Sequence, residues 1–125
     1  IKFGTDGWRA IMAEEFTFAG VRKVAAAIAK HVNAHGGAQR GIVIGYDTRF
    51  LSERFADAAA TVLLGKGIRV LRTVRDTPTP VVAHAVRDTG AFGAIMITAI
   101  VMTMSLTTTT TTTTTTTIIM VTATI

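Results

Sequence analysis

The chain has 125 residues, 49% of them hydrophobic and 17% charged, which is enough for one packed domain and excludes two. The net charge of +5 suits an anionic partner, but the basic residues are scattered and no aromatic side chains alternate with them, so we expect no nucleic acid partner. The absence of cysteine excludes disulfides and thiolate metal sites, and the early Asp6 argues against a secretory signal, so we expect a cytoplasmic protein.

The first candidate site is the segment from Gly4 to Arg9, which reads Gly-Thr-Asp-Gly-Trp-Arg. Its two glycines let backbone amides approach an anion, and Arg9 can offer a bidentate fork to a phosphate. The alternative is a turn shaped by glycine, with Trp8 in the core and Arg9 paired to a carboxylate. Taken alone, the segment favours this alternative.

Helices and strands are expected to alternate through the next part of the chain. Apolar residues recur at helical spacing over residues 21–32 and again over 55–63. Three short β-branched runs are typical of strands buried on both faces. These runs are 41–46, 68–71 and 94–98, and a third helix carries Val82, Ala85 and Val86. This order predicts an α/β fold with a largely parallel sheet.

Capping signals set the expected limits of the second and third helices. Ser52 is the expected cap of the second helix, which should stop at Gly65 or Gly67. Thr79 and Pro80 form a cap and first-turn pair for the third helix, which should end near Gly90.

Loops after the expected strands supply further candidates, because open α/β sheets bind ligands beyond the carboxyl ends of their strands. Asp47 and Arg49 follow the strand at 41–46, and the segment 76–80 follows the next strand. The alternative for the first pair is structural: Asp47 caps the next helix, and Arg49 pairs with Asp47 or with Glu53. That interpretation is favoured for Asp47.

A histidine pair, His31 and His35, is one helical turn apart, which fits a metal site geometrically. No Asp or Glu stands at ligand spacing beside the pair. We therefore interpret it as a polar helix end and expect no metal site in this chain.

The end of the chain differs in composition from the rest. No charged residue occurs after Asp88, and residues 107–117 are all threonine. The apolar stretch before them is too short to span a bilayer, so no membrane segment is expected, and threonine favours extended structure or disorder. We interpret residues 100–125 as sequence that is not native, and the alternative is a threonine-rich assembly or ice-binding surface.

Four motifs in order give the chain a resemblance to the phosphohexomutase family of phosphoglucomutases and phosphomannomutases. They are the segments 3–10, 45–52, 77–80 and 93–99, and together they make residues 1–99 resemble part of the family's first domain. The resemblance implies a three-layer α/β/α sandwich with a largely parallel mixed sheet, here an incomplete domain.

This family moves a phosphoryl group between C1 and C6 of a hexose phosphate through a hexose 1,6-bisphosphate, using a phosphoserine and Mg²⁺. By resemblance, Arg9 steadies the charge of the phosphoserine, and Thr5, Asp47 and Arg49 shape the same pocket. The partners implied are a hexose phosphate and domains II–IV of the same chain, in which the choice between glucose, mannose and glucosamine phosphates resides.

The resemblance breaks after Ala99. The family continues there with Ser-His-Asn-Pro, whereas this chain continues with Ile100-Val101-Met102-Thr103. Ile100 has no hydroxyl to carry phosphate, and Ser105 lacks the His-Asn-Pro context, so we assign no catalytic residue. We expect the chain as written to be inactive. The alternative is a catalytically silent module that binds phosphate or a sugar phosphate.

Overall fold

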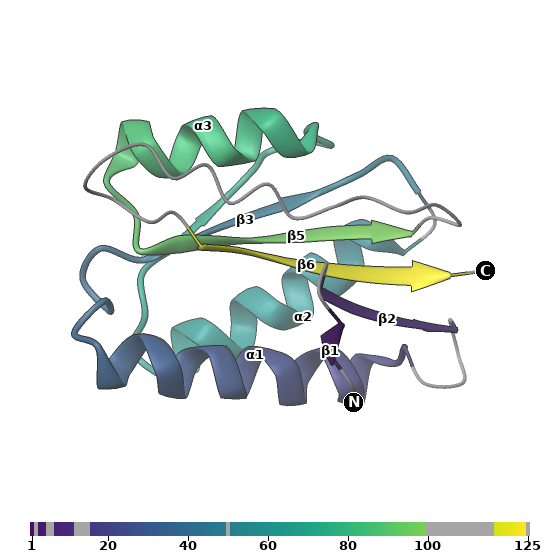
Figure 1. The fold of residues 1–125 in the computed structure, drawn as a ribbon, viewed down its shortest axis with the longest axis horizontal. Helices are drawn as coiled ribbons and strands as arrows, with labels where there is room; N and C mark the ends of the chain where they lie inside the picture. The colour runs from purple at the N-terminus through teal and green to yellow at the C-terminus, as the bar shows by residue number, and fades with distance from the viewer. Residues whose placement is uncertain (2, 5–6, 12–15, 50, 100–116, 125) are drawn as a thin grey trace.

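Strands and helices alternate along the chain in the computed structural model (Figure 1). The structure describes residues 1, 3–4, 7–11, 16–49, 51–99 and 117–124, with backbone alone for 3–4, 7–11, 99 and 117–124. The strands are β1 (Phe3–Gly4), β2 (Gly7–Ile11), β3 (Ile42–Tyr46), β4 (Val70–Arg72), β5 (Gly93–Ala99) and β6 (Thr117–Thr124). The helices are α1 (Phe18–Ala34), α2 (Ser52–Gly65) and α3 (Thr79–Thr89).

The strands form one sheet in the order β1-β2-β6-β5-β3-β4. Every pair is parallel except β1 with β2. Helices α1 and α2 cover one face of this sheet and α3 covers the other (Figure 1). The expected strands 41–46 and 94–98 are thus neighbours in one sheet with helices between them in sequence, and the predicted α/β/α architecture is confirmed.

The face of the sheet under α1 and α2 holds the larger part of the core. Helix α1 buries its apolar side as its spacing predicted, and the Thr17 side chain caps it by accepting from Gly20 N at 3.1 Å. Phe16 meets the Phe55 ring edge to face at 4.9 Å, and Phe18 stacks on Phe55 at 4.5 Å. These rings join the entry to α1 with the first turn of α2.

Two predicted caps are wrong in position. Ser52 is the first residue of α2 rather than its cap; Leu51 takes the cap position, with a left-handed φ of 64° and no side-chain capping bond. Helix α3 is preceded by Pro78 at the cap position, so Thr79 is already helical. Both helices end as expected, α2 at Gly65 and α3 before a left-handed Gly90.

The strand predicted at 68–71 also differs from expectation. Strand β4 spans Val70–Arg72 and is only half-buried, whereas Ile68 is buried but precedes the strand. The physical reason is position, because β4 lies at the edge of the sheet and pairs with β3 alone. The apolar run at 68–71 predicted a strand buried on both faces, whereas the structure has a half-buried strand at the edge of the sheet.

The tail contributes one strand within the described residues. Strand β6 lies between β5 and β2, with Ala99 opposite Ala123 and Arg9 opposite Thr122 (Figure 1). Extended structure, one of the two states expected for the tail, is thus present at 117–124. The rest of the threonine run lies outside the described residues. None of the helices described is long and apolar enough to span a membrane.

Candidate functional site

The loops after β3 and β4 meet the end of β5 at one edge of the sheet. The backbone N–H of Asp47 donates to the carbonyl of Ile97 at 3.2 Å. The N–H of Thr77 donates to the carbonyl of Tyr46 at 2.9 Å. Strand β5 continues from Ile97 toward position 100, so these bonds gather the candidate loops beside it. This is the carboxyl edge at which α/β sheets bind ligands.

The Asp47 carboxylate organises the turn that follows β3. Its Oδ1 accepts from the backbone N–H of Arg49 at 3.1 Å and from the hydroxyl of Ser52 at 2.6 Å. Its Oδ2 lies 3.7 Å from Nε of Arg49. The Asp47 side chain is 19% exposed and that of Arg49 is 44% exposed. Asp47 therefore shapes the turn, while the Arg49 side chain is partly exposed at the edge of the sheet.

The structural alternatives for this pair are confirmed in part. Arg49 does pair with Asp47, as one alternative predicted. Glu53 instead pairs with Arg72, at 3.2 Å. Asp47 bonds to the turn and to the Ser52 side chain, and the cap position of α2 belongs to Leu51. The hydroxyl of Ser52 is thus a site feature that sequence reasoning missed; the signal for it was a serine five residues after an aspartate.

Leu51 carries backbone strain at this site. Its φ of 64° is the one left-handed value found for a non-glycine residue in the described part of the chain. A left-handed conformation costs an L-residue with a bulky side chain about 1–2 kcal/mol. The Leu51 side chain packs against the core, and Phe55 N donates to its carbonyl at 2.9 Å. Surrounding contacts therefore hold a turn that the backbone alone disfavours.

Arg9 lies in the same row of the sheet as Thr98. Both residues are in register with Thr122 of β6, which places their Cα atoms two strands, or roughly 10 Å, apart. The structure describes Arg9 by its backbone alone. Thr5, Ile100 and Ser105 lie outside the described residues. The structure thus brings Asp47, Arg49 and the end of β5 together, with the backbone of Arg9 at the same level.

His31 and His35 stand at the other end of α1 from the Phe16 contact. Their ring centroids are 4.2 Å apart, and His35 Nδ1 lies 2.8 Å from the carbonyl oxygen of His31. Among the residues that the structure describes, no three His, Cys, Asp or Glu side chains gather closely enough to hold a metal ion. The local contacts are those of a polar helix end.

Comparison with known proteins identifies relatives over most of the chain. The family described as phosphoglucomutase/phosphomannomutase, alpha/beta/alpha domain I, matches residues 1–100. A phosphoglucomutase of Staphylococcus saprophyticus is 37% identical over 105 residues, which cover 79% of this chain and 18% of that protein. A phosphoglucosamine mutase of Levilactobacillus brevis is 37% identical over 100 residues, covering 78% of this chain and 22% of that protein.

A solved structure agrees with these relatives. A protein of Thermus thermophilus described as a phosphomannomutase superposes with a TM-score of 0.73 at 42% identity, covering 77% of this chain and 22% of that one. The chain therefore spans about a fifth of the length of the relatives it matches. Because the family match runs from the first residue through the end of β5, the chain belongs to the phosphoglucomutase/phosphomannomutase family by its alpha/beta/alpha domain I.

Proposed function

We propose that the parent protein transfers a phosphoryl group between the C1 and C6 hydroxyls of a hexose phosphate, through a phosphoserine and a hexose 1,6-bisphosphate, in the cytoplasm. The observation that carries the proposal is the Asp47–Arg49 turn. It is bonded to β5 at Ile97, three residues before the position where the family has its serine. Catalysis of this kind depends on positioning and on neutralising phosphate charge more than on covalent steps by other side chains.

Within this proposal, Arg49 and Asp47 have different roles. The Arg49 side chain is 44% exposed, and its guanidinium can donate to phosphate oxygens. The Asp47 carboxylate would repel a phosphate, but it accepts from Ser52 and from Arg49 N, so its role is to hold the turn. Arg9 and Thr5 enter the proposal by resemblance alone, as further groups around the phosphoserine.

We also propose that residues 100–125 are not native sequence and that the chain as written is inactive. Ile100 has no hydroxyl and so can neither accept a phosphoryl group nor give Mg²⁺ an oxygen ligand. Among the described residues, no three His, Cys, Asp or Glu side chains lie close enough together to hold a metal ion. A magnesium ion would require the serine and parts of the parent protein beyond this chain.

A catalytically silent module is the second candidate, and one observation favours it. The turn that presents Arg49 is intact in this chain although isoleucine stands at the serine position. Such a module would bind phosphate or a sugar phosphate without becoming phosphorylated.

The deciding experiment compares two full-length proteins: an unrestored one that carries residues 100–103 of this chain, and a restored one with Ile100→Ser, Val101→His, Met102→Asn and Thr103→Pro. We expect the restored protein to isomerise glucose 1-phosphate when Mg²⁺ and glucose 1,6-bisphosphate are present, and its intact mass to rise by one phosphoryl group. The unrestored protein, incubated with the same bisphosphate, is the control and should keep its mass. Phosphate on Ser105 of the unrestored protein would contradict the proposal, and binding without phosphorylation in both proteins would favour the silent module.

A further inference from the structure

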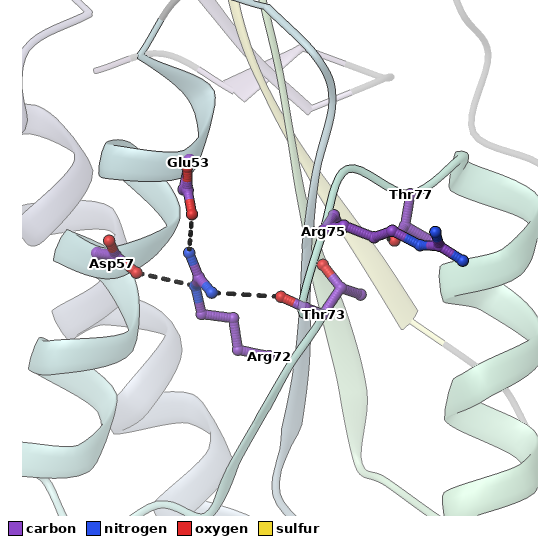
Figure 2. Close-up of polar contacts among 6 residues, drawn as sticks. All are labelled: Glu53, Asp57, Arg72, Thr73, Arg75 and Thr77. Atoms are coloured by element: carbon purple, nitrogen blue, oxygen red, sulfur yellow. Dashed lines mark hydrogen bonds and ion pairs between the residues drawn. The ribbon is translucent and has the colours of Figure 1, made fainter.

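Arg72 connects the edge strand β4 to helix α2 and to strand β3. Figure 2 shows its guanidinium reaching from the strand toward Glu53 and Asp57 of α2. Nη2 donates to Glu53 Oε1 at 3.2 Å, and Nη1 donates to the Thr73 carbonyl at 3.3 Å. The Arg72 Cζ also lies 4.9 Å from the centre of the Tyr46 ring. One side chain of β4 thus contacts two other elements, α2 and β3, as well as the carbonyl of the residue that follows it.

The contact with Asp57 is an ion pair without a well-directed hydrogen bond. Arg72 Nε lies 2.8 Å from Asp57 Oδ1, yet its N–H has no hydrogen-bond partner among the described residues. We attribute the contact to charge attraction rather than to a directed bond. Glu53 and Asp57 are one helical turn apart, and two carboxylates at that spacing repel each other. The guanidinium between them offsets this repulsion at the start of α2.

The two flanks of the Asp47–Leu51 turn are therefore both in contact with Arg72. Tyr46 directly precedes the turn, and Glu53 follows it by two residues. Across the turn, the hydroxyl of Ser52, the first residue of α2, donates to the Asp47 carboxylate. A shift of the first turn of α2 relative to β3 would stretch this bond and release Arg49. The left-handed Leu51 makes the turn dependent on such external support.

Burial decides which part of the contact matters most. The Glu53 and Asp57 side chains are 63% and 60% exposed, so their ion pairs with Arg72 are screened by solvent. The Arg72 side chain is only 27% exposed, and Tyr46 is 5% exposed. A flat guanidinium covers the ring and reaches two carboxylates at once, which a lysine ammonium cannot do. The contact therefore requires arginine rather than positive charge alone.

We propose that Arg72 is a positioning residue: by holding Tyr46 and the first turn of α2 together, it fixes the Asp47 turn and hence the direction of Arg49. The link from Arg49 to phosphate rests on the proposed function. The link from Arg72 to the turn does not, so the two can be tested separately.

The test compares Arg72→Gln and Arg72→Lys with Arg75→Gln as the matched control in the same chain. Arg75 lies in the loop after β4 and is exposed. Among the described residues, its one hydrogen bond is made by its backbone carbonyl, which accepts from the Thr77 hydroxyl. Figure 2 shows its side chain extending away from α2. The measurement is hydrogen exchange of the Arg49 amide by NMR without ligand, relative to the Val43 amide within β3.

We expect Arg72→Gln to speed exchange of the Arg49 amide roughly tenfold relative to that of Val43. The exchange rate in Arg72→Lys should lie between that of Arg72→Gln and that of the unsubstituted chain, and Arg75→Gln should leave the rate unchanged. Equal rates in Arg72→Gln and Arg75→Gln would overturn the proposal. Full rescue by lysine would overturn the requirement for a planar group. If Arg72→Gln fails to fold, Glu53→Gln with Asp57→Asn provides the same test; it should speed exchange severalfold, and an unchanged rate would overturn the proposal.

Titration with inorganic phosphate then separates the two proposals. A faster-exchanging turn together with weaker phosphate binding supports both. A faster-exchanging turn with unchanged phosphate binding supports the positioning role of Arg72 and overturns the phosphate role of Arg49.

Discussion

Replacing Gly45 by alanine would put a methyl group inside the contact between β3 and α3. A Cβ at this position would lie 2.4 Å from Val82 Cγ2 and 3.1 Å from Met96 Sδ. Val82 is fully buried and Met96 is 1% exposed, so neither side chain can turn outward. Gly45 lets α3 approach the strand that leads into Tyr46 and Asp47.

The expected cost follows from two opposing terms. Inserting a methyl group into a close-packed core costs about 1–3 kcal/mol in displaced side chains and backbone. Reduced freedom of the unfolded chain returns about 0.4–1 kcal/mol when glycine becomes alanine. We therefore expect Gly45→Ala to lower the free energy of unfolding by about 1–2 kcal/mol. At a urea m-value of about 2 kcal/mol/M, the midpoint should fall by about 0.5–1 M.

Urea denaturation followed by circular dichroism measures this change, with Gly65→Ala as the control. Gly65 ends α2, and a Cβ there would meet nothing within 4 Å, so the control should stabilise the chain slightly. Combining Gly45→Ala with Val82→Ala makes room for the new methyl group, so the double variant should be more stable than the sum of the single changes by about 1 kcal/mol. The reasoning would be refuted if Gly45→Ala left the urea midpoint unchanged, or if the free-energy changes of Gly45→Ala and Val82→Ala simply added in the double variant.

Two further changes test the turn at the carboxyl edge. Ser52→Ala removes the 2.6 Å hydrogen bond from the Ser52 hydroxyl to Asp47, and because the acceptor is a partly buried carboxylate it should destabilise the chain by about 1–2 kcal/mol. An unchanged urea midpoint in the same denaturation assay would contradict the role of this bond in the turn. Arg49→Gln should weaken binding of inorganic phosphate in an NMR titration by only about two- to fivefold, because the Arg49 side chain is partly exposed and its charge is screened. The control is Arg54→Gln, which removes an exposed arginine of α2, and equal losses of affinity in both variants would argue against a specific contact with Arg49.

Much of the fold was predictable because local patterns report burial directly. The strand at 42–46 and the strand within 93–99 were expected from their β-branched runs, and both lie in the centre of the sheet, where both faces are covered. Helix α1 was expected from its spacing of apolar residues. β4 was misjudged because an apolar run does not reveal whether a strand has one neighbour or two.

The candidate site was predictable only as a set of loops. Asp47 and Arg49 were singled out because they follow a strand, and the structure places them at the expected edge. Their separate roles were not predictable, since the partner of Asp47 is a serine that local signals assigned to a helix cap. Arg72 looked like one of several scattered basic residues until the fold brought it against Tyr46 and α2.

The sequence by itself determined the alternation of elements, the family resemblance and the loss of the serine motif after Ala99. The alternation of elements depends on hydrophobic periodicity within each element, and the other two depend on residue type and order along the chain, all of which the sequence records directly. Only the tertiary structure decided that Arg9 shares a row with Thr98 across β6, that α3 requires a glycine at position 45, and that Arg72 contacts both flanks of the Asp47 turn. Each of these is a spatial relation between residues far apart in the chain, and such relations depend on strand order, register and packing, which no local pattern records.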